Sequence, residues 1–135
     1  MPYMKTLLIA VIFCLGCSTN NDGILLPSNQ DKVIGRVWQA YEYSHNGTSL
    51  NISNQQIIFE LRNDARLYIS RINPVIKDTM FFLFINETNV QLSKPWVNTT
   101  DVSNLRIDRI TDTDFDFTLT NNKNSDIDFY KTQKQ

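Results

Sequence analysis

Alternation of apolar and polar residues with a period of two is the feature that most constrains how this 135-residue chain folds. In the segment 57–61, Ile57, Phe59 and Leu61 fall on one face of a strand. The same alternation recurs in the segments 66–71, 89–92, 104–107, 115–119 and 126–130. Successive side chains of a β-strand point to opposite faces of a sheet, so this pattern predicts half-buried strands with polar residues facing water.

Clusters of turn-forming residues separate these segments, as at Asn46-Gly47 and Asn63-Asp64. No stretch keeps the helical period over a useful length. Short strands between regular turns predict an all-β domain, a single small antiparallel meander of about eight to nine strands, closed as a barrel or packed as a sandwich. The expected strands are about 34–43, 48–52, 56–61, 66–71, 80–85, 89–92, 103–109, 115–120 and 125–131.

The phase of the alternation also predicts which side chains are buried. Leu105 and Phe117 should point into the core, and Arg106 and Asp116 should face water. The segment 80–85 is apolar throughout, which indicates a strand covered on both faces or one side of an interface.

The N-terminus has the pattern of an export signal. Lys5 precedes the apolar residues 7–15, which are too few to cross a bilayer that needs about 20. Residues 13–18 (Phe-Cys-Leu-Gly-Cys-Ser) resemble a bacterial lipobox, in which a small residue precedes the cysteine that is lipidated. That resemblance implies a lipoprotein signal peptide at 1–16, palmitate or a similar acyl chain on Cys17, and a lipid anchor in the cell envelope, at the outer membrane.

Beyond the signal, residues 17–32 are rich in turn formers and amides and predict a flexible tether. The β domain is expected at 33–131, followed by a C-terminal tail at 132–135. Cys14 and Cys17 are the only cysteines, so the β domain has neither a disulfide nor a thiolate metal site.

Segments 34–38 (Ile-Gly-Arg-Val-Trp), 57–61 and 105–119 together resemble the small lipocalin-like lipoproteins of Bacteroidetes. The resemblance implies a barrel that holds a small apolar ligand, and it names neither a ligand nor catalytic residues. One difference is that Gly35 and Trp38 are three residues apart, where that family has Gly-x-Trp. This spacing indicates a bulge or a different β fold. Asp78-Thr79-Met80 also resembles the O-glycosylation motif of exported proteins from these bacteria.

Charge and composition narrow the function. The chain has 14 acidic and 13 basic residues, interspersed, which argues against binding to nucleic acid. His45, the only histidine, is expected to be a solvated turn residue without a second ligand for a metal. Two groups of aspartates are expected to lie on solvated strand faces, Asp112/Asp114/Asp116 and Asp126/Asp128. We therefore predict no enzyme activity, no catalytic residue, no metal and no cofactor.

Three aromatic side chains remain as candidates for contact with a ligand or partner. Trp38 lies in a predicted strand and is expected mainly in the core, Trp96 lies in a loop, and Phe82 lies in the apolar strand. The leading hypothesis is a membrane-anchored, non-catalytic binding module for a small apolar ligand. The alternative is a protein-interaction partner, such as an immunity protein or a surface-assembly subunit.

Overall fold

Nine antiparallel strands follow one short helix in the computed structural model, which describes residues 28–94 and 102–135. The predicted strands are all present, and most boundaries agree within three residues because turn clusters mark them. The elements are α1 (Asn29–Val33), β1 (Arg36–His45), β2 (Thr48–Leu50), β3 (Ile58–Leu61), β4 (Arg66–Arg71), β5 (Ile76–Phe84), β6 (Asn89–Ser93), β7 (Ser103–Ile110), β8 (Asp114–Asn121) and β9 (Ile127–Lys134).

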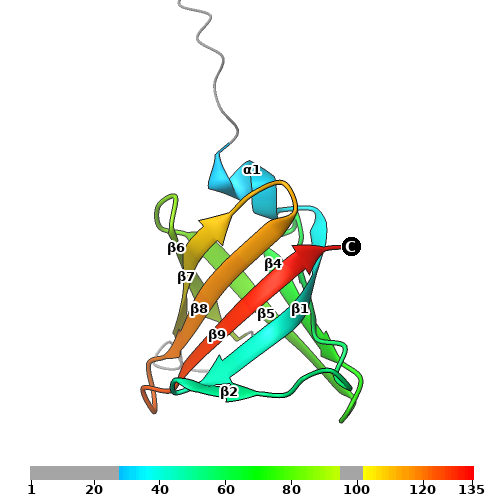
Figure 1. The fold of residues 1–135 in the computed structure, drawn as a ribbon. Helices are drawn as coiled ribbons and strands as arrows, with labels where there is room; N and C mark the ends of the chain where they lie inside the picture. The colour runs from blue at the N-terminus through cyan, green and yellow to red at the C-terminus, as the bar shows by residue number, and fades with distance from the viewer. Residues whose placement is uncertain (1–27, 95–101) are drawn as a thin grey trace, which may run out of the picture.

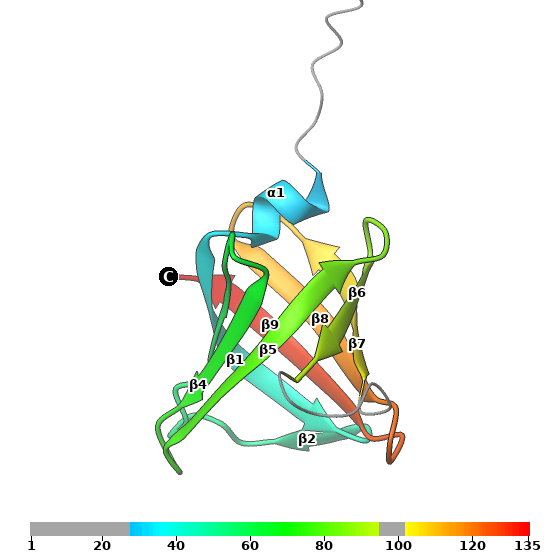
Figure 2. The same cartoon turned by 180° about the vertical axis from the view of Figure 1, so that it is seen from behind.

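The strands form a closed barrel, so the barrel alternative is confirmed over the sandwich (Figure 1). Each strand from β3 to β8 pairs with the strand that follows it, and β1 pairs with both β3 and β9. This closes an eight-stranded up-and-down barrel, the architecture that lipocalins have. The remaining strand, β2, is not one of these eight and pairs only with the last part of β1 (Figure 2). Closure satisfies the strand edges that an open sheet would expose.

Two predicted boundaries are wrong. The tether does not extend to residue 32, because Ser28 begins a helix. The Ser28 side chain accepts a hydrogen bond from the Asp31 backbone N–H at 3.2 Å, and the Asp31 carboxylate accepts one from the Ser28 backbone N–H at 3.1 Å. Residues 132–134 are not a tail, because β9 continues to Lys134. Thr132 is fully buried and pairs with Ala40 and Phe115, so these last residues form part of the barrel wall.

The spacing between Gly35 and Trp38 has a simple explanation. Gly35 precedes β1 and turns the chain with a φ of +74°, a conformation that favours glycine. The two residues therefore do not share a strand face. A bulge does occur in β1, but it lies between Ala40 and Glu42, where the register with β9 shifts.

A column of aromatic rings fills the barrel along its length. Trp38 lies 5.4 Å from Phe115, Phe115 lies 4.7 Å from Phe117, and Phe117 lies 5.3 Å from Tyr130, measured between ring centroids. Tyr130 stacks on Tyr43 at 4.7 Å. Aromatic pairs at these separations add stabilisation beyond the area that they bury.

The apolar segment 80–85 divides between the two faces of the barrel wall. Phe82 is buried, and Met80 and Phe84 pack against the core. The alternate residues Phe81, Leu83 and Ile85 are 41%, 61% and 58% exposed. The described part of the chain does not cover this outer row, so the prediction of a strand covered on both faces is wrong.

The predicted phase is correct for Leu105, Phe117 and Arg106, but wrong for Asp116, which is only 6% exposed. Asp116 lies between Arg109 on β7 and Lys131 on β9, its direct cross-strand neighbours. Burial raises the pKa of Asp116, while the charges of Arg109 and Lys131 and a hydrogen bond from the Thr132 backbone act against this increase. Asp116 is thus buried at a position that alternation alone would place in water, with Arg109 Nη1 3.9 Å from its Oδ2.

We predict that Asp116→Asn is at least as stable as the wild type at pH 7. Because folding raises the pKa of Asp116, the folded state holds this proton more tightly than the unfolded chain. Wild-type stability therefore gains a contribution as the pH falls through the raised pKa, and the variant does not. The advantage of Asp116→Asn should shrink toward acid pH, which urea denaturation of both proteins at pH 7 and pH 4 would measure.

Phe117→Ala provides the comparison for this experiment. It removes a fully buried ring and should cost about 3–5 kcal/mol at both pH values. A stability difference between Asp116→Asn and the wild type that stays constant or grows as the pH falls would contradict the role assigned to Asp116 burial.

Candidate functional site

Helix α1 closes one end of the barrel. The indole Nε1–H of Trp38 donates to the Val33 carbonyl oxygen at 3.3 Å, which fixes the end of α1 to the core. Asn29 at the start of α1 donates from its backbone N–H to Glu87 Oε2 at 2.9 Å and from Nδ2 to the Glu87 carbonyl oxygen at 2.8 Å. These bonds tie the helix to the β5–β6 turn. Figure 1 shows that the opposite end has no such cover among the described residues.

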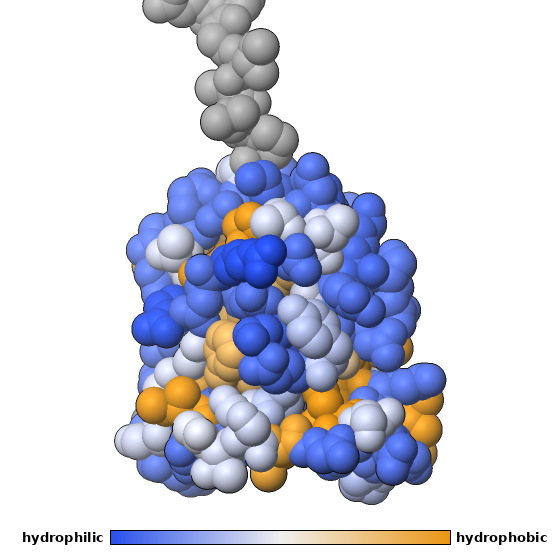
Figure 3. Space-filling model, in the orientation of Figure 1, coloured by the Kyte–Doolittle hydropathy of each residue, from blue (hydrophilic) through white to orange (hydrophobic). Residues whose placement is uncertain are grey.

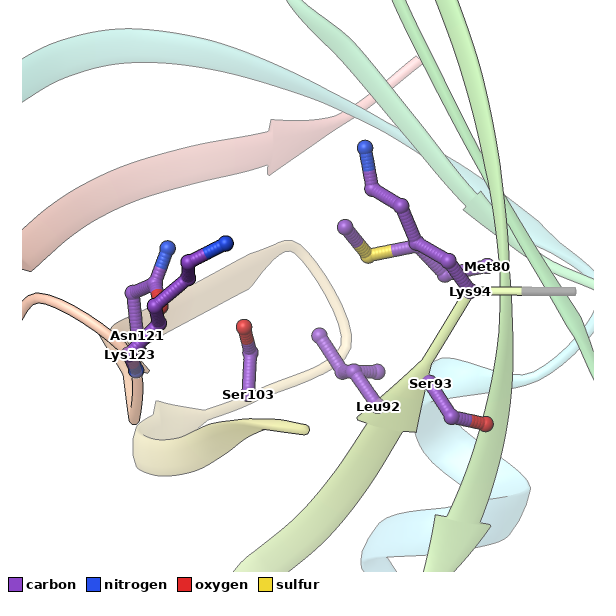
Figure 4. A pocket seen from close by; sticks show the side chains of 7 residues that line it. All are labelled: Met80, Leu92, Ser93, Lys94, Ser103, Asn121 and Lys123. Carbon is purple, nitrogen blue, oxygen red and sulfur yellow. Dashed lines mark hydrogen bonds between the residues drawn. The ribbon is translucent and has the colours of Figure 1, made fainter. Parts of the chain in front are cut away.

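Among the described residues, two of the hollows lie at the opposite end, which we call the open end. The first has a volume of about 290 Å³ and combines the apolar side chains of Met80 and Leu92 with polar groups. Figure 4 shows Lys123 and Asn121 on one side of it, Met80 and Lys94 on the other, and Ser103 between them. The hollow therefore presents both an apolar surface and hydrogen-bonding groups.

The second hollow has a volume of about 170 Å³ and is more apolar. Its lining residues are Ile57, Ile69, Arg71, Ile76, Asp78 and Tyr130. An ion pair joins the two hollows, because Lys94 lines the first, Asp78 lines the second, and Lys94 Nζ lies 2.9 Å from Asp78 Oδ2. This pair is partly exposed, so it contributes little to the stability of the fold. It places one positive and one negative charge where the two hollows meet.

Arg71 is the exceptional polar residue of the second hollow. Its Nε is buried and has no hydrogen-bond partner among the described residues. Its Nη1 makes one long hydrogen bond, 3.4 Å, to Gln55 Oε1. Buried polar groups in folded proteins are almost always paired, so an unpaired guanidinium nitrogen beside a hollow requires an explanation.

A hydrogen-bonded cluster lies beside these hollows, on the inner face of β1 and β9. Asp128 Oδ1 accepts from the Tyr43 hydroxyl at 2.7 Å and lies 2.8 Å from His45 Nδ1. His45 and Asp128 were expected to be solvated. The His45 side chain is 42% exposed and the Asp128 side chain is 28% exposed, and the two are also bonded to each other. The reason is that both fall in the inward phase of paired strands, where His45 lies opposite Asp128.

The pKa values of the side chains in this cluster are shifted. Burial, followed by the hydrogen bond to Asp128, raises the pKa of Tyr43 to about 12. Burial also raises the pKa of Tyr130, and the hydrogen bond to Asp128 raises the pKa of His45. Both phenols therefore keep their protons at neutral pH and can donate hydrogen bonds, but they carry no negative charge.

The described residues contain no group of three or more histidine, cysteine, aspartate or glutamate side chains that could hold a metal ion. They also contain no helix long and apolar enough to cross a membrane. Thr79, in the motif that resembles an O-glycosylation site, lies in the wall of the barrel and is partly buried.

The sequence did not predict the residues that line the hollows. Trp38 and Phe82 lie in the core and line neither hollow, and Trp96 and Cys17 lie outside the described residues. Arg71 and Asp78 carried a signal that could have found them. Each continues the inward phase of its strand, after Leu67 and Ile69 in β4 and before Met80 and Phe82 in β5, and a charge in that phase indicates the mouth of a barrel.

No family model and no curated protein sequence matches this chain. Among solved structures, the bovine lipocalin allergen Bos d 2 is similar, with a TM-score of 0.47 and 12% sequence identity over 76% of this chain and 71% of that chain. Because this similarity is weak, the assignment of the barrel rests on the strand pairing of the chain itself.

Proposed function

We propose that this chain is a membrane-anchored, non-catalytic binding module whose open end holds a small ligand. The observation that carries the proposal is the asymmetry of the barrel, which is closed by α1 at one end and hollowed at the other. Small-molecule sites are concave, mostly apolar and equipped with a few polar groups, and the mouths of β-barrels are a common place for them.

The size of the hollows limits the ligand. The aromatic column from Trp38 to Tyr43 occupies the barrel interior, so an apolar ligand cannot extend far toward α1. Volumes of about 290 and 170 Å³ lie at or below the range of about 300–1,000 Å³ that is typical of sites for drug-sized molecules. We therefore infer a compact ligand with an apolar part that lies against Met80, Leu92 or the isoleucines.

The surface around the open end is consistent with this use. Figure 3 shows apolar residues gathered toward the end opposite α1. The strands that begin or end there carry exposed apolar side chains, including Leu50 of β2, Ile76 of β5 and Ile127 of β9. An apolar rim lowers the cost of moving an apolar group from water into the hollow.

Ser103→Phe should weaken ligand binding at the first hollow. The Ser103 side chain faces the hollow, and a phenyl ring there would take up part of its volume. Displacement of an environment-sensitive apolar dye from the full-length chain would measure the loss, with an expected decrease in affinity of about tenfold or more.

Asn104→Phe is the matched control, because Asn104 is the next residue of β7 and is exposed on the outer face. It should leave dye binding unchanged. Equal dye binding by the wild type and by Ser103→Phe would contradict the placement of the site.

The proposed lipid anchor would join the barrel at its closed end. The lipobox places Cys17 eleven residues before Ser28, and Ser28 begins α1 at the closed end of the barrel. A span of that length reaches at most about 36–40 Å. An anchor on Cys17, at the outer membrane, would therefore keep the closed end of the barrel within that distance of the bilayer.

Cys17→Ser should abolish membrane retention and leave the barrel folded. The substitution removes the acylated thiol, and two or more acyl chains are needed for stable anchoring. Labelled palmitate incorporation and membrane fractionation of both proteins would measure the effect. A wild-type chain without incorporated label would disprove the anchor.

A second candidate function is interaction with a protein, and one observation favours it. Phe81 and Leu83 on the outer face of β5, together with Ile85 just after the strand, form an exposed apolar row, which we call the outer stripe. Contiguous exposed apolar side chains often mark interaction sites. A partner of this kind, such as a toxin or a surface-assembly subunit, would contact the barrel wall and leave the open end free.

Under this candidate, Leu83→Glu should remove a protein that copurifies with the chain from the native membrane fraction, because it buries a charge in the contact. Gln91→Glu is the control, since Gln91 is the direct neighbour of Leu83 on β6 and gains the same charge without loss of apolar area. Recovery of the same proteins with Leu83→Glu as with the wild type would rule out the outer stripe as their docking surface.

A further inference from the structure

We propose that Arg71 is the anion-binding residue of the second hollow and that the ligand held there is a short aliphatic carboxylate. This inference rests on the proposed function, because it names the ligand class for the same open end. It follows from the unpaired guanidinium nitrogen, the neighbours of Arg71 and the size of the hollow.

Strand β4 directs Arg71 into the barrel. Leu67 and Ile69 precede it in the same phase and pack in the core or against it, so the Arg71 side chain continues their row toward the open end. Its Nε is buried without a partner among the described residues, and its only hydrogen bond there is the long one to Gln55. The guanidinium fork is thus held at the hollow with most of its donors unused.

Neighbouring acidic groups do not satisfy this fork. Asp78 lines the same hollow, but its Oδ1 accepts from the Thr79 backbone N–H at 2.9 Å and its Oδ2 pairs with Lys94 at 2.9 Å. Asp128 Oδ1 is bonded to Tyr43 and to His45. The carboxylates beside Arg71 therefore already have other partners.

The two tyrosines near Arg71 do not neutralise it either. Arg71 acts electrostatically on both Tyr43 and Tyr130 and lowers the pKa of each, yet burial keeps both phenols protonated. The Tyr43 hydroxyl already donates to Asp128 Oδ1, and the two tyrosine hydroxyl groups are hydrogen-bonded to each other. The phenols therefore bring no negative charge to the hollow, and the guanidinium donors of Arg71 stay available to an incoming anion.

The rest of the lining selects the kind of anion. Ile57, Ile69 and Ile76 provide an apolar wall for an alkyl group, and the volume of about 170 Å³ admits only a short one. A guanidinium fork binds both carboxylate and phosphate. Asp78 and Asp128 nearby would repel the second charge of a phosphate monoester, so the structure favours a monoanionic carboxylate.

Methyl NMR of the full-length chain in lipid nanodiscs tests the inference at the site itself. Isoleucine δ1-methyl labels report on Ile57, Ile69 and Ile76 in the hollow, and on exposed Ile72 and Ile127 as internal references. The probes are hexanoate, hexanol and hexylammonium, which share an alkyl chain and differ in charge. Hexanoate should shift the three hollow methyl signals in a saturable way, and hexanol should require at least about tenfold higher concentration.

Arg71→Gln should lower the affinity for hexanoate to that for hexanol and leave the affinity for hexanol unchanged. Arg71→Lys should keep part of the preference, because it retains the charge but loses the planar fork. Arg66→Gln is the matched control, since Arg66 lies at the other end of the same strand and is exposed. It should change neither affinity.

The outcomes separate this inference from the proposed function. If hexanol and hexanoate bind equally to the wild type, or if Arg71→Gln leaves hexanoate binding unchanged, the role of Arg71 is wrong and the small-ligand site stands. If none of the three probes shifts the methyl signals of the hollow and no dye binds, both are wrong. Should Arg71→Gln fail to fold, the comparison of hexanoate with hexanol on the wild type decides alone.

Discussion

Pairing between β1 and β9 is the interaction on which the rest of the structure depends. It joins the first and last strands of the barrel over Trp38 to His45 and converts a meander with two open edges into a closed wall. Closure also gives every strand an inner and an outer face. The alternating apolar and polar residues of the sequence fall on these two faces. The bulge between Ala40 and Glu42 changes the phase of β1 along this seam and places both Tyr43 and His45 on the inner face.

The inside of the barrel then changes in character from one end to the other. Trp38 and Phe115 fill it beneath α1, and Phe117 and Tyr130 continue the packing toward the open end. At the open end, around Tyr130, the inward positions include the charged residues Arg71 and Asp78 beside isoleucines. A small domain has enough apolar side chains to fill only part of such a barrel, and the positions left over are where water and ligands can reach the interior.

Most of the fold could be predicted from the sequence because strands and turns are local features. The predicted burial of Phe117 and Leu105 follows directly from alternation. The burial of Asp116 could not be predicted in this way, since its cross-strand neighbours Arg109 and Lys131 come from two other strands. The last residues of β9 were also not predicted as strand. No local pattern marks the end of β9 at Lys134, and Lys134 pairs with Trp38, which is remote in sequence.

The candidate site was harder to predict because it includes the charged residues Arg71 and Asp78, which lie in the inward phase of their strands but resemble solvated strand ends. Trp38 and Phe82 attracted attention as large aromatic residues, yet closure of the barrel places both in the core. Arg71 reads in the sequence as the polar end of a strand. Only the closed barrel shows that this end lies beside a hollow, where a guanidinium nitrogen stays buried and unpaired.

A buried guanidinium nitrogen without a hydrogen-bond partner is costly, and a fold keeps one only when other interactions are strong enough to hold it. Here the holding interactions are the pairing of β4 with β3 and β5 and the packing of Leu67 and Ile69, none of which involves the charge. The wall of the barrel thus presents Arg71 to the hollow whether or not an anion is there. A site arranged in advance loses less entropy when its ligand binds. The barrel wall that packs aromatic rings in its interior therefore also holds a charged side chain in a fixed position beside the hollow at its open end.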